Sequence, residues 1–214
     1  MLFVAMLLIA NTIAMKIVKL GPFNIQAGIL CFPLTYIFGD VLVEVYGYAK
    51  SRLVIWTGLL CQVFMAAFYY LSVLLPPASF WEGQEAWSSF FSLSPRIVAG
   101  SLIAYAVGEF LNAVVMSRLK IHTSGRFLWI RTIGSTIIGE GADTLVFNFI
   151  AFAWVFEFKN LFSIIISAYL LKVAYEIVAT PFTYSIVAWL KRVEGVDHFD
   201  HKLKSYNPFK ILNE

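Results

Sequence analysis

Eight ionisable side chains lie in stretches of the sequence that are otherwise almost wholly apolar: Asp40, Glu44, Glu109, Arg131, Glu140, Asp143, Lys172 and Glu176. A charged side chain at the centre of a hydrocarbon layer costs about 2.5–3.5 kcal/mol, whereas an apolar residue returns only about 0.3–0.6 kcal/mol. We therefore expect these side chains to face a polar interior, where they are ion-paired or protonated. Groups placed in this way can bind a polar solute or carry a proton.

The spacing of these residues puts several of them on one face of a helix. The pairs that share a face are Asp40–Glu44, Glu140–Asp143 and Lys172–Glu176. We expect Lys172 to neutralise Glu176 on its own helix, and Arg131 to pair with Glu44. Four acids are then left without a cation: Asp40, Glu109, Glu140 and Asp143. Such a surplus predicts protonated acids, a wet cavity or a ligand rich in hydrogen-bond donors.

The composition places these residues in a membrane protein. The chain has 214 residues, of which 60% are hydrophobic, 17% aromatic and only 14% charged. Soluble domains carry about 25% charged residues. Low polarity excludes a disordered chain, two cysteines exclude a disulfide scaffold, and a net charge of +3 does not supply a nucleic-acid-binding face.

Six apolar segments predict an all-α membrane protein with six transmembrane helices. They are residues 1–16, 27–46, 53–75, 97–116, 129–154 and 162–190. We expect one transmembrane domain over residues 1–190 and a cytoplasmic C-terminal tail over residues 191–214. A row at four-residue steps, formed by Gly100, Ala104, Gly108 and Asn112, predicts close packing of the fourth helix.

The distribution of charge predicts the orientation. Ten Lys and Arg residues lie outside the helices on the side of the two termini, against four on the opposite side, so both termini are expected in the cytoplasm. The aromatic loop over residues 76–95 is expected at the membrane interface. The second and fifth helices carry similar stretches, IFGDVLVEV and IIGEGADTL, which suggest a 3+3 inverted repeat.

Two long stretches resemble the signatures of a known family. DVLVEVYGYAKSR (residues 40–52) and RTIGSTIIGEGADTLVFNFIAF (residues 131–152) resemble those of the queuosine precursor transporters, the YhhQ-like proteins. PRIVAGSLIAYAVGEFLN (residues 95–112) and SYNPF (residues 205–209) are similar to that family as well. The resemblance implies a multi-pass importer of the bacterial inner membrane. Its substrates would be 7-deazaguanine precursors of queuosine, chiefly 7-cyano-7-deazaguanine, salvaged for tRNA modification.

Individual residues follow the family pattern. The matching positions are Asp40, Glu44, Tyr46, Gly47, Arg131, Ser135, Gly139 and Asp143. The chain departs from some members, which have Gln and Asp at the positions of Glu109 and Asn112.

The chemistry of such a substrate agrees with the acids. A 7-deazaguanine presents a ring N–H and an exocyclic amine side by side, and one carboxylate can accept both. We expect Asp143 or Glu140 to accept them, with Asp40 as the next choice, while Arg131, Lys172 or Asn148 would donate to the oxo group. An aromatic ring such as Tyr46, Tyr105 or Phe147 would stack on the flat base. The predicted substrate-binding residues are Asp40, Glu44, Tyr46, Glu109, Arg131, Glu140, Asp143, Phe147, Lys172 and Glu176.

The energy source stays open at this point. The sequence has no Walker A pattern, so proton coupling and passive exchange are the two candidates. The competing functions are a substrate-capturing subunit of a vitamin-type ABC importer and, from another class, an intramembrane enzyme. We expect no enzymatic activity, no cofactor, no metal and no direct contact with nucleic acid. The expected partners are the lipid bilayer and the small-molecule 7-deazaguanine, and a homodimer is left open.

Overall fold

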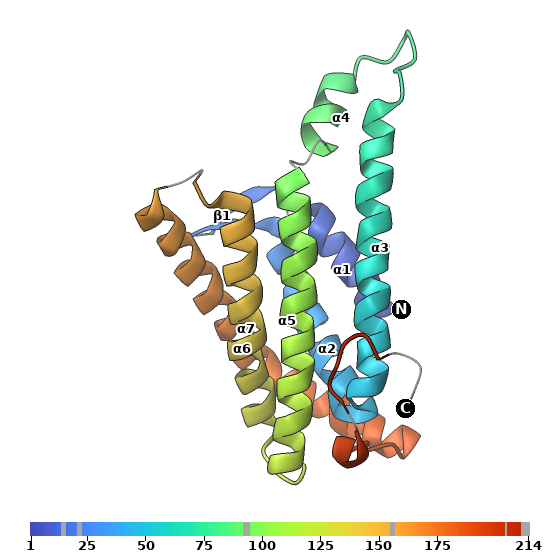
Figure 1. The fold of residues 1–214 in the computed structure, drawn as a ribbon, viewed down its shortest axis with the longest axis vertical. Helices are drawn as coiled ribbons and strands as arrows, with labels where there is room; N and C mark the ends of the chain where they lie inside the picture. The colour runs from blue at the N-terminus through green and yellow to red at the C-terminus, as the bar shows by residue number, and fades with distance from the viewer. Residues whose placement is uncertain (14–15, 21–22, 92–94, 155–156, 204, 211–214) are drawn as a thin grey trace.

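The computed structural model of the chain describes residues 1–13, 16–20, 23–91, 95–154, 157–203 and 205–210. Its α-helices are α1 (Leu2–Ile13), α2 (Phe32–Tyr46), α3 (Tyr48–Leu74), α4 (Gln84–Phe91), α5 (Pro95–His122), α6 (Leu128–Phe152) and α7 (Phe158–Glu194). Each apolar segment predicted from the sequence overlaps one of the helices α1, α2, α3, α5, α6 and α7. The additional helix, α4, lies within the predicted aromatic loop (Figure 1).

A small antiparallel hairpin departs from the all-α expectation. It is formed by β1 (Ile17–Leu20) and β2 (Phe23–Gln26), with Ile17 opposite Gln26 and Leu20 opposite Phe23. The 3-10 helix η1 (Ala27–Leu30) leads from it into α2, and a second one, η2 (Asp200–Lys202), lies in the tail. Figure 1 shows the hairpin near one end of the bundle and the C-terminus at the other.

Three helices are long and apolar enough to cross a membrane by length and composition: Tyr48–Leu74, Ile97–His122 and Leu161–Glu194. The 12 residues of α1 extend about 18 Å, less than the hydrocarbon thickness of about 30 Å. The 25 residues of α6 are long enough, but its polar residues keep it out of this set. The fold is therefore that of a helical membrane protein, with three clear candidate spans among the described residues.

Glycines bring α5 and α6 into direct contact. A Cβ atom added to Gly108 would lie 2.7 Å from the Cβ of Asp143, and one added to Gly139 would lie 2.7 Å from the Cβ of Asn112. The two helix backbones can approach this closely because neither glycine has a side chain. This contact confirms the close packing predicted for the small-residue row of the fourth apolar segment, and it places Asn112 beside α6.

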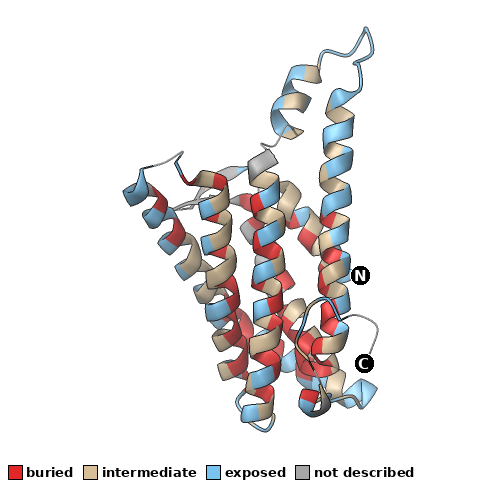
Figure 2. Cartoon of the chain, in the orientation of Figure 1, coloured by how far each residue is buried: buried red, intermediate tan, exposed pale blue. Residues whose placement is uncertain are grey.

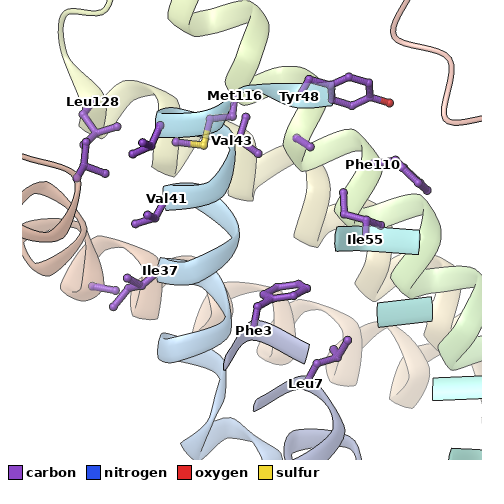
Figure 3. Packing of buried hydrophobic residues seen from close by; sticks show 14 of the residues in the cluster. Phe3, Leu7, Ile37, Val41, Val43, Tyr48, Ile55, Phe110, Met116 and Leu128 are labelled. Carbon is purple, nitrogen blue, oxygen red and sulfur yellow. The ribbon is translucent and has the colours of Figure 1, made fainter. Parts of the chain in front are cut away.

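The apolar core surrounds α2. Figure 3 shows buried residues on both sides of this helix, with Val41 and Ile37 on one side and Phe3 of α1 and Ile55 of α3 on the other. Buried residues gather in the half of the bundle that holds the C-terminus, whereas the far half of α3 is largely exposed (Figure 2). Exposed apolar side chains on that part of α3 suit contact with lipid.

Candidate binding site

Buried polar side chains form two groups, which we name by their residues. The Glu44 cluster comprises Glu44, Lys120, Arg131, Lys191 and Asp197. The mid-bundle cluster comprises Asp40, Glu109, Asn112, Glu140, Asp143, Lys172 and Glu176. Its members come from α2, α5, α6 and α7, so four helices contribute to one polar region.

In the Glu44 cluster, cations surround one fully buried carboxylate. Arg131 donates to both oxygens of Glu44, from Nε at 3.0 Å and from a terminal nitrogen at 2.9 Å. Lys191 adds a hydrogen bond of 2.7 Å, and the Nζ of Lys120 lies 3.6 Å away. The predicted pairing of Arg131 with Glu44 is therefore confirmed. A bidentate arginine–carboxylate pair fixes both distance and orientation.

The tail completes this cluster through Asp197. Its carboxylate lies 2.6 Å from the Nζ of Lys120 and 2.9 Å from that of Lys191. The Lys120 ammonium also donates to the main-chain oxygen of Glu44. Partial burial by itself raises the pKa of Asp197, but hydrogen bonds from the two lysines outweigh it, and the pKa lies below its ordinary value. Asp197 is thus held ionised where the tail meets α5 and α7.

The rest of the described tail packs on the corner between α2 and α3. Asp200 accepts hydrogen bonds from the main-chain N–H of Tyr48, at 2.9 Å, and from the hydroxyl of Ser117, at 2.5 Å. Gly47 forms this corner with a φ of 82°, and a side chain there would collide with His198. Three further side chains donate to tail carbonyls: Tyr48 to Tyr206, Arg52 to Asn207 and Trp56 to Pro208.

Lys172 is the cation of the mid-bundle cluster. Its Nζ lies 2.5 Å from an oxygen of Asp143 and 2.9 Å from an oxygen of Glu140. The expected pairing with Glu176 is wrong, because neither oxygen of Glu176 has a hydrogen-bond partner among the described residues. The physical reason is that α6 presents two carboxylates to one ammonium group. Glu140 and Asp143, which were expected to lack a cation, therefore share this one.

Several buried oxygen atoms in and beside this cluster lack a hydrogen-bond donor among the described residues. They are Oδ2 of Asp40, Oδ1 of Asn112, Oγ1 of Thr144 and both carboxyl oxygens of Glu176. The amide of Asn112 donates to the other oxygen of Asp40, at 3.1 Å. Most buried polar atoms in proteins have a partner. The region can therefore accept hydrogen bonds from a ligand, from water or from an added proton.

Glu109 approaches α2 next to this region. A Cβ atom added to Gly39 would lie 3.9 Å from a carboxyl oxygen of Glu109. Gly39, Glu109 and Asn112 line a small internal cavity whose other walls are mainly apolar. The cavity has space for about one water molecule. This cavity is too small for a ring-sized ligand, which could enter it only if the helices around it moved apart.

The three aromatic candidates lie in different surroundings. The hydroxyl of Tyr46 donates to Glu194 at 2.7 Å, beside the tail. The hydroxyl of Tyr105 donates to a main-chain oxygen of α3 at 3.2 Å, so this ring packs between α5 and α3. Phe147 lies one turn after Asp143 on α6 and is half-buried. Of the three, Phe147 is the best placed to stack on a ligand at α6.

A polar stripe on α6 was not predicted from the sequence. Residues at consecutive four-residue steps are all buried: Thr132, Thr136, Glu140, Thr144 and Asn148. A four-residue period marks one face of a helix, so this regular spacing could have revealed the stripe. It shows that the interior face of α6 is polar along almost its whole length, with the mid-bundle cluster near its centre.

A second hollow lies between α4 and the end of α3. This groove has a volume of about 330 Å³, and Trp81 and Trp87 are among its lining residues. The two indole rings lie 6.4 Å apart, nearly perpendicular. The indole N–H of Trp87 donates to the hydroxyl of Ser72 at 3.1 Å and so holds α4 against α3. Figure 1 shows α4 at the end of the bundle opposite the tail.

Comparisons with known proteins converge on one group. Residues 26–186 match the family described as putative vitamin uptake transporters. This span contains every member of the mid-bundle cluster. A probable queuosine precursor transporter of Bacillus subtilis (strain 168) is 31% identical over 82% of this chain and 77% of its own length.

Two further relatives carry similar names. The queuosine precursor transporter of Escherichia coli (strain K12) is 30% identical over 67% of this chain and 62% of its own length. A probable queuosine precursor transporter of Haemophilus influenzae is 30% identical, over 65% of this chain and 59% of its own length. No solved structure matches the chain significantly.

Proposed function

Since the chain belongs to the family of putative vitamin uptake transporters, we propose that it imports 7-deazaguanine precursors of queuosine, such as 7-cyano-7-deazaguanine. Three relatives are named as transporters of queuosine precursors, and none is named as an enzyme. The single observation that carries the proposal is the excess of acids over the one ammonium group in the mid-bundle cluster, where oxygen atoms of Asp40, Asn112 and Thr144 also lack a donor among the described residues. A base edge with adjacent N–H groups supplies donors to such a region.

The contacts of Lys172 suggest how the base binds. Arg131 is held by Glu44 in the other cluster, and the side-chain amide of Asn148 donates to its own helix. Lys172 contacts the two acids that would read the base, so it is the best placed donor for the oxo group. The base would insert between Lys172 and Asp143. The carboxylate of Asp143 or Glu140 then accepts the ring N–H and the amine, and the ammonium turns to the oxo oxygen. Asp40 stays the next choice for the edge-reading acid.

The lengths of the helices suggest which segments cross the membrane and which of them move. The 20 residues of η1 and α2, joined through Cys31, extend about 30 Å together and could form one span. We propose six membrane-crossing segments in two inverted halves, with the tail end of the bundle in the cytoplasm of the bacterial inner membrane. The close contact between α5 and α6 makes them a rigid pair, so movement of α2 and α7 against that pair would open the site. Import energised by protons fits the surplus of acids.

The test uses a bacterium that cannot make the precursor and lacks its own importer. With the chain expressed, queuosine is expected in tRNA at low external precursor. Asp143→Asn is expected to abolish it at an unchanged protein level in the membrane. The matched control is Glu157→Gln, which removes an exposed carboxylate at the start of α7 and is expected to keep uptake. Absence of rescue by the intact chain, with the protein present in the membrane, would contradict the proposed function.

A second candidate is favoured by the family description, which names vitamin uptake. In that case the chain captures substrate for a separate ABC-type energising complex. Purified chain in liposomes separates the two candidates. Uptake by the chain alone supports an independent importer, whereas uptake that requires the added complex supports a capture subunit.

A further inference from the structure

We propose that Glu176, predicted above among the substrate-binding residues, instead carries the proton that couples uphill import and does not contact the base. The proposal rests on the proposed transport function. Glu176 combines three features: burial with both carboxyl oxygens unpartnered among the described residues, acids that face it from two helices, and a place on α7 close to a proline. The first two favour a neutral carboxyl group, and the third favours a change of its access.

The first feature is burial without partners. Glu176 is 1% exposed, and both of its carboxyl oxygens lack a hydrogen-bond partner among the described residues. The hydroxyl of Thr180 donates to the main-chain oxygen of Glu176, at 2.7 Å. An ionised carboxylate buried in this way without a donor among the described residues carries a large desolvation penalty. A bound proton removes this penalty.

The second feature is the sign of the neighbouring charges. Glu140 faces Glu176 from α6 and Asp40 faces it from α2, so the two helices packed against α7 here both present acids. Lys172 lies one turn before Glu176 on α7, and its ammonium is drawn to the carboxylates of α6. The repulsion from Glu140 and Asp40 favours the protonated form of Glu176 in this arrangement.

The third feature is local flexibility of α7. Pro181 lies inside this helix, five residues after Glu176. Proline cannot donate to the carbonyl of Ile177, so one hydrogen bond of the helix is lost next to Glu176. Bending at this point would turn the carboxyl group toward one side of the bundle or the other. A carrier of a coupling proton needs this change of access.

The geometry also links the proton to the substrate. Lys172 and Glu176 share one face of α7, so an ionised Glu176 would attract the Lys172 ammonium. While Glu176 is protonated, Lys172 stays available to the oxo group of the base. After the proton leaves toward the cytoplasm, Glu176 becomes a carboxylate, pairs with Lys172 and withdraws it from the base. Proton and substrate therefore bind together and leave together, as proton symport requires.

The test uses the intact chain in liposomes with 7-cyano-7-deazaguanine as the probe. An inward gradient of one pH unit in a one-proton symporter supports about a tenfold accumulation. The wild-type chain is expected to reach accumulation of that order and to acidify the lumen during uptake. Glu176→Gln resembles the permanently protonated side chain. This variant is expected to keep exchange of labelled for unlabelled precursor at equal pH and to lose accumulation.

The controls make each outcome decisive. Glu157→Gln removes an exposed acid from the start of the same helix and should behave as wild type. Glu176→Asp keeps a titratable group and should retain accumulation, with a shifted pH dependence. Undiminished accumulation by Glu176→Gln, or accumulation by the wild-type chain driven by a sodium gradient at equal pH, would overturn the assignment of Glu176. Failure of the wild-type chain to exchange the precursor at all would instead overturn the proposed function.

Discussion

The two polar clusters contain similar residues but differ in the balance of charge. The Glu44 cluster sets three cations against two acids, and each acid has two cations within 3 Å. The mid-bundle cluster sets five acids against the single ammonium of Lys172. It also leaves oxygens of Asp40, Asn112 and Glu176 without a donor among the described residues.

This contrast distinguishes buried polar residues that stabilise the fold from buried polar residues that serve transport. Burying charges is costly, and the cost is offset only where each charge has its partners in good geometry. The Glu44 cluster meets this condition and joins α2, α5, α6, α7 and the tail. The mid-bundle cluster does not meet it, because several of its oxygen atoms have no donor among the described residues. Variants of the first cluster should therefore change stability, and variants of the second should mainly change transport.

The largest effect on stability is expected from Glu44→Ala. This change leaves the buried cations Arg131, which is 1% exposed, and Lys120 without Glu44. Asp197 is then the one acid that remains in the Glu44 cluster. Stranding buried charges costs about 3–5 kcal/mol. We expect a large loss of monodisperse protein and a lower thermal midpoint in detergent. The control Glu194→Ala removes the partner of the Tyr46 hydroxyl at the surface and should change stability by less than about 0.5 kcal/mol. Equal midpoints for the two variants would contradict the contrast.

The next largest effect is expected where α5 and α6 touch. Gly139→Ala places a Cβ atom 2.7 Å from the Cβ of Asn112 and 2.9 Å from the main-chain oxygen of Gly108. Overpacking of this kind costs about 1–3 kcal/mol, and separating the helices should also disturb the mid-bundle cluster. In the control Gly134→Ala, on the same helix, the new atom meets the mobile tip of Leu119 at 3.2 Å. The thermal midpoint and precursor binding are measured on both variants. A Gly139→Ala variant with an unchanged midpoint and unchanged binding would contradict the close contact.

The sequence predicts the positions of the helices along the chain better than the side-chain contacts between them. Long apolar runs locate α3, α5, α6 and α7 to within a few residues, since hydrophobic length is visible in the sequence. The partner of Lys172 could not be predicted in this way. Which acids it meets depends on how α7 is rotated against α6. That rotation is set by packing between the helices and not by the spacing along either one.

The contacts of the tail are a second feature that could not be predicted from the sequence. The polar segment after the last helix predicts a cytoplasmic tail but no contacts for it, whereas Arg52 and Trp56 donate to tail carbonyls. Main-chain acceptors leave no mark in composition or periodicity, so these contacts are invisible in the sequence. The pairing of Arg131 with Glu44 was predictable because both are charged and lie toward the same end of the bundle. The buried threonines of α6 were also open to prediction, through their four-residue period.

A small effect on stability is expected from Asp40→Asn. The amide oxygen of the new side chain can still accept the hydrogen bond from Asn112. Its –NH2 group replaces the carboxyl oxygen that lacks a donor among the described residues. Replacing an unsatisfied buried acceptor is close to neutral, within about 1 kcal/mol. We therefore expect an unchanged or slightly higher thermal midpoint together with impaired precursor uptake. A variant that unfolds like Glu44→Ala would show that Asp40 belongs to the structural class.

The smallest effect is expected at the edge of the Glu44 cluster, in the pH dependence of the tail. The pKa of Asp197 is lower in the folded chain than its ordinary value, because hydrogen bonds from Lys120 and Lys191 outweigh its partial burial. A depressed carboxylate pKa adds stability above the ordinary value of about 4, and this contribution is lost as the pH falls through the lower, folded value. The Asp197 side chain is 44% exposed, so solvent screening limits the contribution to a fraction of about 1 kcal/mol. Thermal midpoints of the wild-type chain and Asp197→Asn should differ slightly near neutral pH and converge in acid. A difference that grows on acidification would reverse the sign and show that the tail is not held by an ionised Asp197.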